Sequence, residues 1–261
     1  MTLLDRIINN KKRELVILKK IKSFDRLRKA VVKLPKKNHC FFRALKKKKR
    51  FAVIAEIKKS SPSRGVLRKD FKPAAIAKSF ERAGAAALSV LTDEKFFGGS
   101  AVIFKKVRGA TKLPLLRKDF TLDIYQVYEA RWIGADAVLL IAAILSREEL
   151  TELSGTALEL GLDVLFEVHT LNDIKKILPL KPQIVGINNR DLKTFHTNLG
   201  VTARLIKRLP RKTLAVSESG IQNARDLLRL KCLGVRAALV GERLMRQKDP
   251  GAALKRLRSE I

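Results

Sequence analysis

The sequence predicts a (β/α)₈ barrel preceded by a helical N-terminal extension, and three observations support this prediction. From Phe51 onward, eight short apolar runs alternate with stretches of helical character. Most runs are continuously apolar, as expected for parallel strands that are covered on both faces. A template in which glycine ends one helix and leads into the next strand recurs at Gly84, Gly134 and Gly234, at spacings of 50 and 100 residues.

Residues 1–50 differ from the rest of the chain. Apolar residues between Leu3 and Ile21 recur at roughly helical spacing, interrupted by Lys and Arg, which predicts one amphipathic helix. A second short helix is expected near Phe24 to Leu34, and Pro35 ends it. We expect residues 1–50 to pack on the barrel of residues 51–261, so that both form one structural domain.

The eight expected strands are Ala52–Ile57, Ala86–Leu91, Leu115–Arg117, Ala137–Ile141, Val164–Glu167, Ile184–Ile187, Leu214–Ser217 and Ala237–Val240. The helices expected between and after them include Ala74–Ala83, Ile124–Ile133, Arg147–Leu160, Leu171–Ile177, Thr202–Leu209, Ala224–Leu230 and Ala252–Leu257. A doubly wound open sheet is the alternative with the same alternation. That fold would normally carry a glycine-rich fingerprint after its first strand, and this chain has none.

The net charge of +31 usually indicates a nucleic acid or an anionic membrane as partner. Here the charge is spread over the whole chain, and aromatic residues, at 6%, are too scarce to form base-stacking platforms.

No apolar run reaches the roughly 18 residues of a membrane span, and residues 1–20 lack the apolar block of a signal peptide. Cys40 and Cys232 have no metal-like spacing. We expect a cytoplasmic protein without a membrane partner, a metal or a specific nucleic-acid site.

Polar residues follow the strands at the end where a barrel of this kind has its active site. They are Glu56 and Lys58 at the first strand, Lys118 at the third, Glu167 at the fifth, Asn188 and Arg190 at the sixth, and Glu218 at the seventh. Glu56 and Lys58 are two residues apart and therefore share one face of their strand. Charged groups that converge in this way shift one another's pKa values, which acid–base catalysis uses.

Glycines mark the ends of the last two strands. Ser219-Gly220 and Gly241-Glu242 lie where backbone N–H groups can approach an anion, and phosphate sites of such barrels are often built there. The segment 92–100 after the second strand is expected to be a lid, and its two phenylalanines could cover a flat ring. His169 is expected to lie in a loop or on the rim.

Together these motifs resemble the indole-3-glycerol phosphate synthase family, over nearly the whole chain and including the helical extension. The matching segments are Ala55–Lys58 with Ser60–Ser63, Leu91–Phe97, Arg117–Phe120, Gly186–Leu192, Ser217–Gly220 and Val240–Glu242. The resemblance implies ring closure of 1-(2-carboxyphenylamino)-1-deoxy-ribulose 5-phosphate to indole-3-glycerol phosphate, with loss of carbon dioxide and water. It implies a small, anionic, phosphorylated substrate and no cofactor.

The resemblance also implies roles for single residues. Lys118 is the acid at the carbonyl oxygen, Glu167 its proton-transfer partner, and Lys58 an alternative acid. Glu56 stabilises positive charge on the anilino nitrogen, Asn188 orients the substrate, and Glu218 holds the charges in place. Further expected positions are Lys58, Ser219, Gly220, Gly241 and the Glu242 N–H around the phosphate, Ser61 and Arg190 near the carboxylate, and Phe97, Phe120, Leu139 and Leu192 along the aromatic pocket.

Two other functions remain open on the sequence alone. One is a related phosphate-binding barrel such as phosphoribosylanthranilate isomerase, whose chemistry needs a Cys base and an Asp acid at strand ends, where neither cysteine of this chain lies. The other is a basic RNA-binding protein, whose binding would collapse steeply with added salt. We expect the protein to be a monomer or a weak homo-oligomer.

Overall fold

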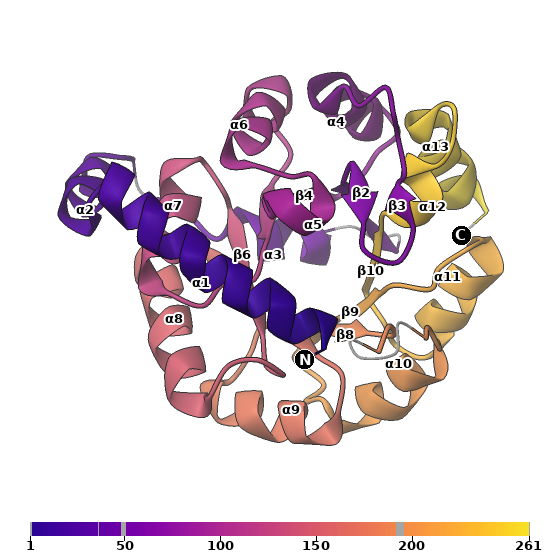
Figure 1. Ribbon diagram of the computed structural model, residues 1–261. Helices are drawn as coiled ribbons and strands as arrows, with labels where there is room; N and C mark the ends of the chain where they lie inside the picture. The colour runs from indigo at the N-terminus through magenta and orange to yellow at the C-terminus, as the bar shows by residue number, and fades with distance from the viewer. Residues whose placement is uncertain (1, 36, 48–50, 192–195, 261) are drawn as a thin grey trace.

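Eight parallel strands close into a barrel, which confirms the predicted fold class (Figure 1). The computed structural model describes residues 2–35, 37–47, 51–191 and 196–260. The barrel strands are β1 (Ala52–Ile57), β4 (Ala87–Leu91), β5 (Leu115–Lys118), β6 (Ala137–Ile141), β7 (Asp163–Val168), β8 (Ile184–Asn188), β9 (Leu214–Glu218) and β10 (Ala237–Val240). The last strand pairs with the first, in the register Ala52↔Ala237, and this pairing closes the barrel.

Helices surround the strands on the outside (Figure 1). They are α4 (Pro73–Arg82), α6 (Ala101–Ala110), α7 (Ile124–Trp132), α8 (Arg147–Glu159), α9 (Leu171–Ile177), α10 (Gly200–Leu205), α11 (Ala224–Cys232), α12 (Glu242–Met245) and α13 (Pro250–Ser259), with short 3₁₀ turns at Leu178–Leu180 and Ile206–Arg208. Helix α6 was not among the expected helices. Ser100 caps its first turn by accepting a hydrogen bond from the Ile103 N–H.

Alternation along each strand decides which side chains enter the barrel. In β1, Ala52 and Ile54 belong to the cluster inside the barrel, whereas Val53, Ala55 and Ile57 pack outward against the helices. Glu56 follows the inward series. The same rule separates two adjacent cations in β5, because Lys118 faces the interior and Arg117 contacts helix α7.

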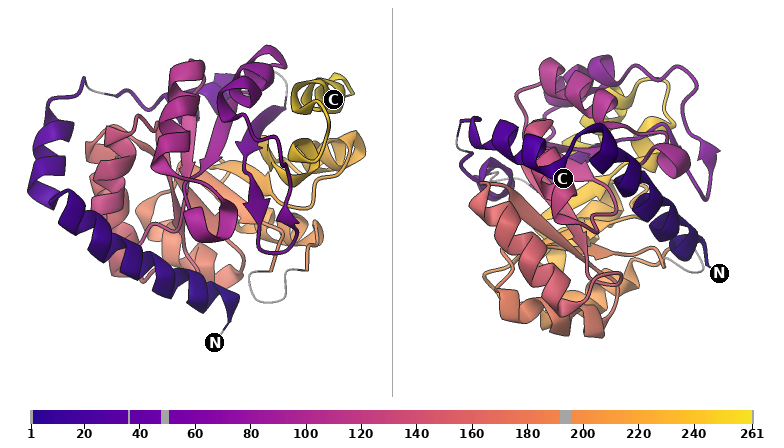
Figure 2. Two further views of the ribbon diagram at one scale, coloured as in Figure 1. Left: turned by 45° about the horizontal axis from the view of Figure 1, so that its top comes forward. Right: turned by 60° about the vertical axis from the view of Figure 1, so that its left-hand side comes forward.

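The N-terminal extension wraps around the barrel from one end to the other. Helix α1 (Leu3–Ile21) crosses the barrel end that carries the strand carboxyl ends, here called the mouth, and α2 (Phe24–Val32) packs against α7 (Figures 1 and 2). Helix α3 (Cys40–Lys47) covers the opposite end. Its Phe41 and Leu45 are buried in the same cluster as the barrel interior. We propose that residues 1–50 and the barrel therefore unfold together.

We predict that Phe41→Ala lowers the free energy of unfolding by about 3–5 kcal/mol, because it leaves a cavity where the ring closes the barrel bottom. Urea unfolding followed by tryptophan fluorescence and by circular dichroism measures this, and both probes should report one transition. Val32→Ala is the control, since Val32 is 76% exposed and its loss should cost less than about 0.5 kcal/mol. Two separate transitions in the wild type would contradict a single folding unit.

Candidate active site

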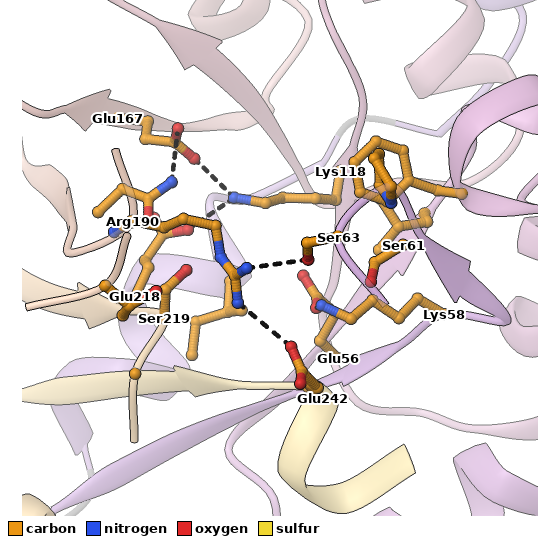
Figure 3. A pocket seen from close by; sticks show the side chains of 18 of the residues that line it. Glu56, Lys58, Ser61, Ser63, Lys118, Glu167, Arg190, Glu218, Ser219 and Glu242 are labelled. Atoms are coloured by element: carbon orange, nitrogen blue, oxygen red, sulfur yellow. Dashed lines mark hydrogen bonds and ion pairs between the residues drawn. The ribbon is translucent and has the colours of Figure 1, made fainter. Parts of the chain in front are cut away.

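A cavity of about 450 Å³ opens at the mouth of the barrel. Seven of its lining residues are the charged and polar groups predicted from the strand ends: Asn188 and, labelled in Figure 3, Glu56, Lys58, Lys118, Glu167, Arg190 and Glu218. Other predicted residues that line it are Ser61, Phe97, Phe120, Leu139, Ser219, Gly220, Gly241 and Glu242. The predicted Leu192 lies outside the described residues.

Lys118 is the central charge of the cavity. Its side chain is only 14% exposed, and its Nζ lies 2.7 Å from Glu167 Oε2 and 2.6 Å from Glu218 Oε2 (Figure 3). Burial alone would lower the pKa of Lys118, but the charges of Glu167, Glu218 and Glu56 outweigh it and raise this pKa well above its usual range. Lys118 is therefore an ammonium group with two proton-accepting neighbours.

The two carboxylates beside Lys118 differ in the donors they meet. Glu167 accepts from Lys118, from Asn188 Nδ2 at 3.1 Å and from the His169 ring at 3.0 Å, whereas Glu218 meets only Lys118 among the described side chains. Burial raises the pKa of both, but the Lys118 charge and the His169 hydrogen bond bring that of Glu167 below its usual range. Burial and the Glu167 charge raise the pKa of Glu218 to about 7 despite Lys118. Glu167 is therefore ionised and Glu218 readily takes up a proton.

Glu56 and Lys58 lie side by side, as their two-residue spacing predicts. Lys58 Nζ is 2.5 Å from Glu56 Oε2. Glu56 also lies against Gly241, where a Cβ would come within 2.1 Å of Glu56 Oε2. Glycine at position 241 thus lets the backbone at the end of β10 approach a carboxylate of β1. The sequence pattern did not suggest this steric role for Gly241.

The ends of β9 and β10 bring the predicted phosphate residues together. Ser219 and Gly220 both have positive φ angles, 65° and 81°, so the chain turns sharply as it leaves β9. A Cβ at Gly220 would lie 2.6 Å from Thr197 Cγ2, which leaves no room for a larger residue. Gly241 precedes α12 on the neighbouring strand end. These two turns follow neighbouring strands, and both line the cavity.

Arg190 lies between the β2–β3 hairpin, Ser60–Ser61 with Gly65–Val66, and the start of α12. Its guanidinium donates to Ser63 Oγ at 2.9 Å and to Glu242 Oε2 at 3.2 Å (Figure 3). Ser61, predicted to share the substrate carboxylate with Arg190, is buried, and its hydroxyl has no hydrogen-bond partner among the described atoms. The contact of Arg190 with Glu242 was not among the sequence predictions.

The other wall of the cavity is apolar. The rings of Phe97, from the short helix α5 (Glu94–Phe97), and Phe120 lie 6.2 Å apart, tilted by 39°. Leu139 adds to this wall from inside β6, and Leu4 and Ile7 of α1 reach the same cavity. The contribution of α1 was not predicted, because helical periodicity says which residues share a face but not which end of the barrel that face covers.

His169 was expected to be a loop or rim residue, and its contact with Glu167 was missed. The signal was available, since Leu165, Glu167 and His169 continue the inward alternation of β7 one residue beyond its end.

Lys11 was also missed, although it lies between the apolar Ile7 and Leu15 at four-residue spacing on the buried face of α1. Lys11 is 4% exposed, and its Nζ lies 3.2 Å from Asp93 Oδ2, 3.0 Å from Asp119 Oδ1 and 2.7 Å from Glu14 Oε2. Burial lowers the pKa of Lys11, but these carboxylates raise it overall. The ion pairs join α1 to the residue that follows Lys118.

Within the described residues, no group of three or more His, Cys, Asp or Glu side chains is placed to hold a metal ion. None of the helices in the described parts of the chain has the length and apolar character needed to cross a bilayer.

The closed barrel and its charged mouth define a (β/α)₈-barrel enzyme built for acid–base chemistry. The sequence matches the family model for indole-3-glycerol phosphate synthase over residues 4–257. The chain therefore belongs to the indole-3-glycerol phosphate synthase family. This confirms the predicted function in tryptophan biosynthesis and the predicted enzyme class, a carboxy-lyase.

Similar proteins support the same family. Indole-3-glycerol phosphate synthase of Albidiferax ferrireducens is 54% identical over 206 residues, which cover 79% of this chain and 78% of that protein. The enzyme of the same name from Prochlorococcus marinus is 46% identical over 265 residues, with 99% and 90% covered. The tryptophan synthase α subunit of Legionella pneumophila superposes with a TM-score of 0.61 at 13% identity, covering 85% of this chain and 96% of that one, which shows the shared fold alone.

We predict that Lys11→Ala lowers the free energy of unfolding by about 3–5 kcal/mol, because it leaves Asp93 and Asp119 buried without their shared cation. Thermal and urea unfolding measure the change. Lys12→Ala is the matched control, since Lys12 is exposed on the same helix and should change stability by less than about 0.5 kcal/mol. Equal stabilities of the two variants would show that the buried ion pairs do not hold α1 in place.

Proposed function

We propose that this cavity catalyses the ring closure of 1-(2-carboxyphenylamino)-1-deoxy-ribulose 5-phosphate, with Lys118 as the acid. The observation that carries the proposal is the largely enclosed Lys118 ammonium between Glu167 and Glu218, which lines a cavity with apolar residues and glycine-containing turns. The apolar side suits the aromatic ring, and the turns after β9 and β10 suit the phosphate.

The first step forms the carbon–carbon bond. The ring carbon that bears the carboxylate attacks the ketone carbon, and Lys118 gives its proton to the carbonyl oxygen, which becomes a hydroxyl. The carboxylate then leaves as carbon dioxide, and its bonding electrons restore the aromatic ring. A substrate oxygen that takes the place of Glu218 next to Lys118 removes one of the charges that raise the Lys118 pKa, so donation becomes easier.

The second step removes water. The new hydroxyl leaves with a proton, and the carbon next to the nitrogen loses a proton to complete the indole. Glu167 is ionised and contacts Lys118, so it can accept the proton from the carbon. The proton that leaves with the hydroxyl comes from Lys58, or from Lys118 after it has taken up a new proton from solvent. Glu56, beside Lys58, faces the cavity where it can stabilise positive charge on the anilino nitrogen, and Asn188 orients the substrate beside Glu167.

The binding roles follow from the same geometry. We assign the phosphate to Lys58, Ser219, Gly220, Gly241 and the Glu242 N–H, and the substrate carboxylate to Ser61, whose buried hydroxyl is unpaired among the described atoms. Arg190 reaches the carboxylate only if it leaves Glu242. We further propose a cytoplasmic monomer or weak homo-oligomer without a nucleic-acid partner; the +31 charge opposes close association of copies.

We predict that Lys118→Ala removes turnover, leaving less than about 1% of the wild-type rate, because no other buried cation touches both glutamates among the described residues. The measurement is the increase of indole fluorescence when the purified protein meets the carboxyphenylamino substrate. Circular dichroism checks that the variant is folded, and Lys106→Ala, an exposed change on α6, is the control. Retention of more than a few per cent of activity would refute the role of Lys118.

We predict that Glu167→Gln lowers kcat by about 100-fold or more while KM changes by only a few-fold, because an amide cannot accept the proton. Steady-state kinetics separates the two constants. The control is Glu159→Gln, at the exposed end of α8, which should leave both unchanged. A large rise in KM with an unchanged kcat would instead make Glu167 a binding residue.

A further inference from the structure

His169 is held in one place beside the catalytic carboxylate. It follows the last residue of β7, and its side chain is 11% exposed. Its backbone N–H donates to Asp173 Oδ2 at 2.9 Å, and Asp173 also forms the capping box of α9 with Thr170. The backbone of His169 is therefore anchored to the start of α9, and the side chain is largely enclosed.

The ring has a single polar contact among the described residues. His169 Nε2 lies 3.0 Å from Glu167 Oε1, and the buried Nδ1 has no hydrogen-bond partner among the described atoms. A buried polar group without a partner costs free energy, so the placement of this ring is not explained by its own hydrogen bonding. Its one polar interaction points at Glu167.

The contact divides the two oxygens of Glu167 between different neighbours. Oε2 meets the Lys118 ammonium, while Oε1 receives Asn188 Nδ2 and faces the His169 ring. Because Oε1 contacts both Asn188 and His169, the carboxylate cannot rotate without breaking these two hydrogen bonds. Oε2 is thus the oxygen that stays directed at Lys118 and the substrate space.

The charges around His169 support an N–H that donates to Glu167. Burial lowers the pKa of His169, but the hydrogen bond and charge of Glu167, together with the charges of Asp173 and Glu218, raise it overall. Lys118 contacts the other oxygen of Glu167, Oε2, and the uncharged Asn188 shares Oε1 with the His169 ring.

We propose that His169 is a positioning residue: by donating from Nε2 to Glu167 Oε1, it fixes the carboxylate so that Oε2 exchanges the proton with Lys118 and the substrate. This inference rests on the proposed proton-transfer role of Glu167.

Kinetics of three variants tests the role. His169→Leu should lower kcat by about 10- to 100-fold, the scale of a small misplacement of a catalytic group, with KM within about threefold of wild type. His169→Gln should recover most of the lost kcat, because its amide can still donate to Glu167. His39→Gln, which alters a histidine at the opposite barrel end beside Asp163, should change nothing. Equal rates of wild type and His169→Leu, or no recovery by His169→Gln when that variant is folded, would overturn the proposal.

Nuclear magnetic resonance tests the contact without any turnover. The chain has three histidines, so the His169 ring signal is the one that His169→Gln removes. In the wild type it should titrate above the ordinary histidine pKa of about 6.5, and Glu167→Gln should lower that pKa. A His169 pKa that Glu167→Gln leaves unchanged would overturn the inference. An inactive wild type with the expected titration would instead refute the proposed function and leave the contact intact.

Discussion

The largely enclosed ammonium of Lys118 is the constraint on which the rest of the site depends. An unpaired charge at this depth would be expensive, so two glutamates must reach it from different strands. Side-chain alternation meets this requirement, because Lys118 and Glu218 are the last residues of β5 and β9, and Glu167 is the last inward residue of β7, which ends at the outward-facing Val168. Closure of the barrel thus turns three distant sequence positions into one ionic cluster.

The cluster is asymmetric because hydrogen-bond donors are unequally distributed. Glu167 has three donors and keeps its negative charge, whereas Glu218 has one among the described side chains and shares its space with a like charge. Two carboxylates on one cation therefore acquire different proton affinities, which is how a single cavity can serve both proton donation and proton acceptance. The Lys11 side chain and the Arg117–Asp119–Thr92 contacts hold the outer side of the same strand end.

Most of the fold could be predicted from sequence, because each barrel unit carries a local signal. All eight predicted strands match the observed ones to within one residue at either end. For example, β4 begins at Ala87 rather than at Ala86, whose N–H donates to the Val53 carbonyl just before the strand begins. The sequence also predicted that the charged residues and glycines at the strand ends lie close together, since all strands of such a barrel end at the same mouth. Helix α6 and the covering helix α3 carried weaker signals, in short segments beside glycine or basic residues.

By itself the sequence determined the barrel, the inward pairs such as Glu56 with Lys58, and the family, because these depend on period-two alternation and on motifs within a few residues. Only the tertiary structure decided that Lys11 bridges Asp93 and Asp119, that His169 holds Glu167, and that Arg190 contacts Glu242. These contacts depend on the path of α1 across the mouth and on which hydrogen-bond donors lie close to each carboxylate. Such choices follow from three-dimensional distance and burial, which local sequence patterns do not encode.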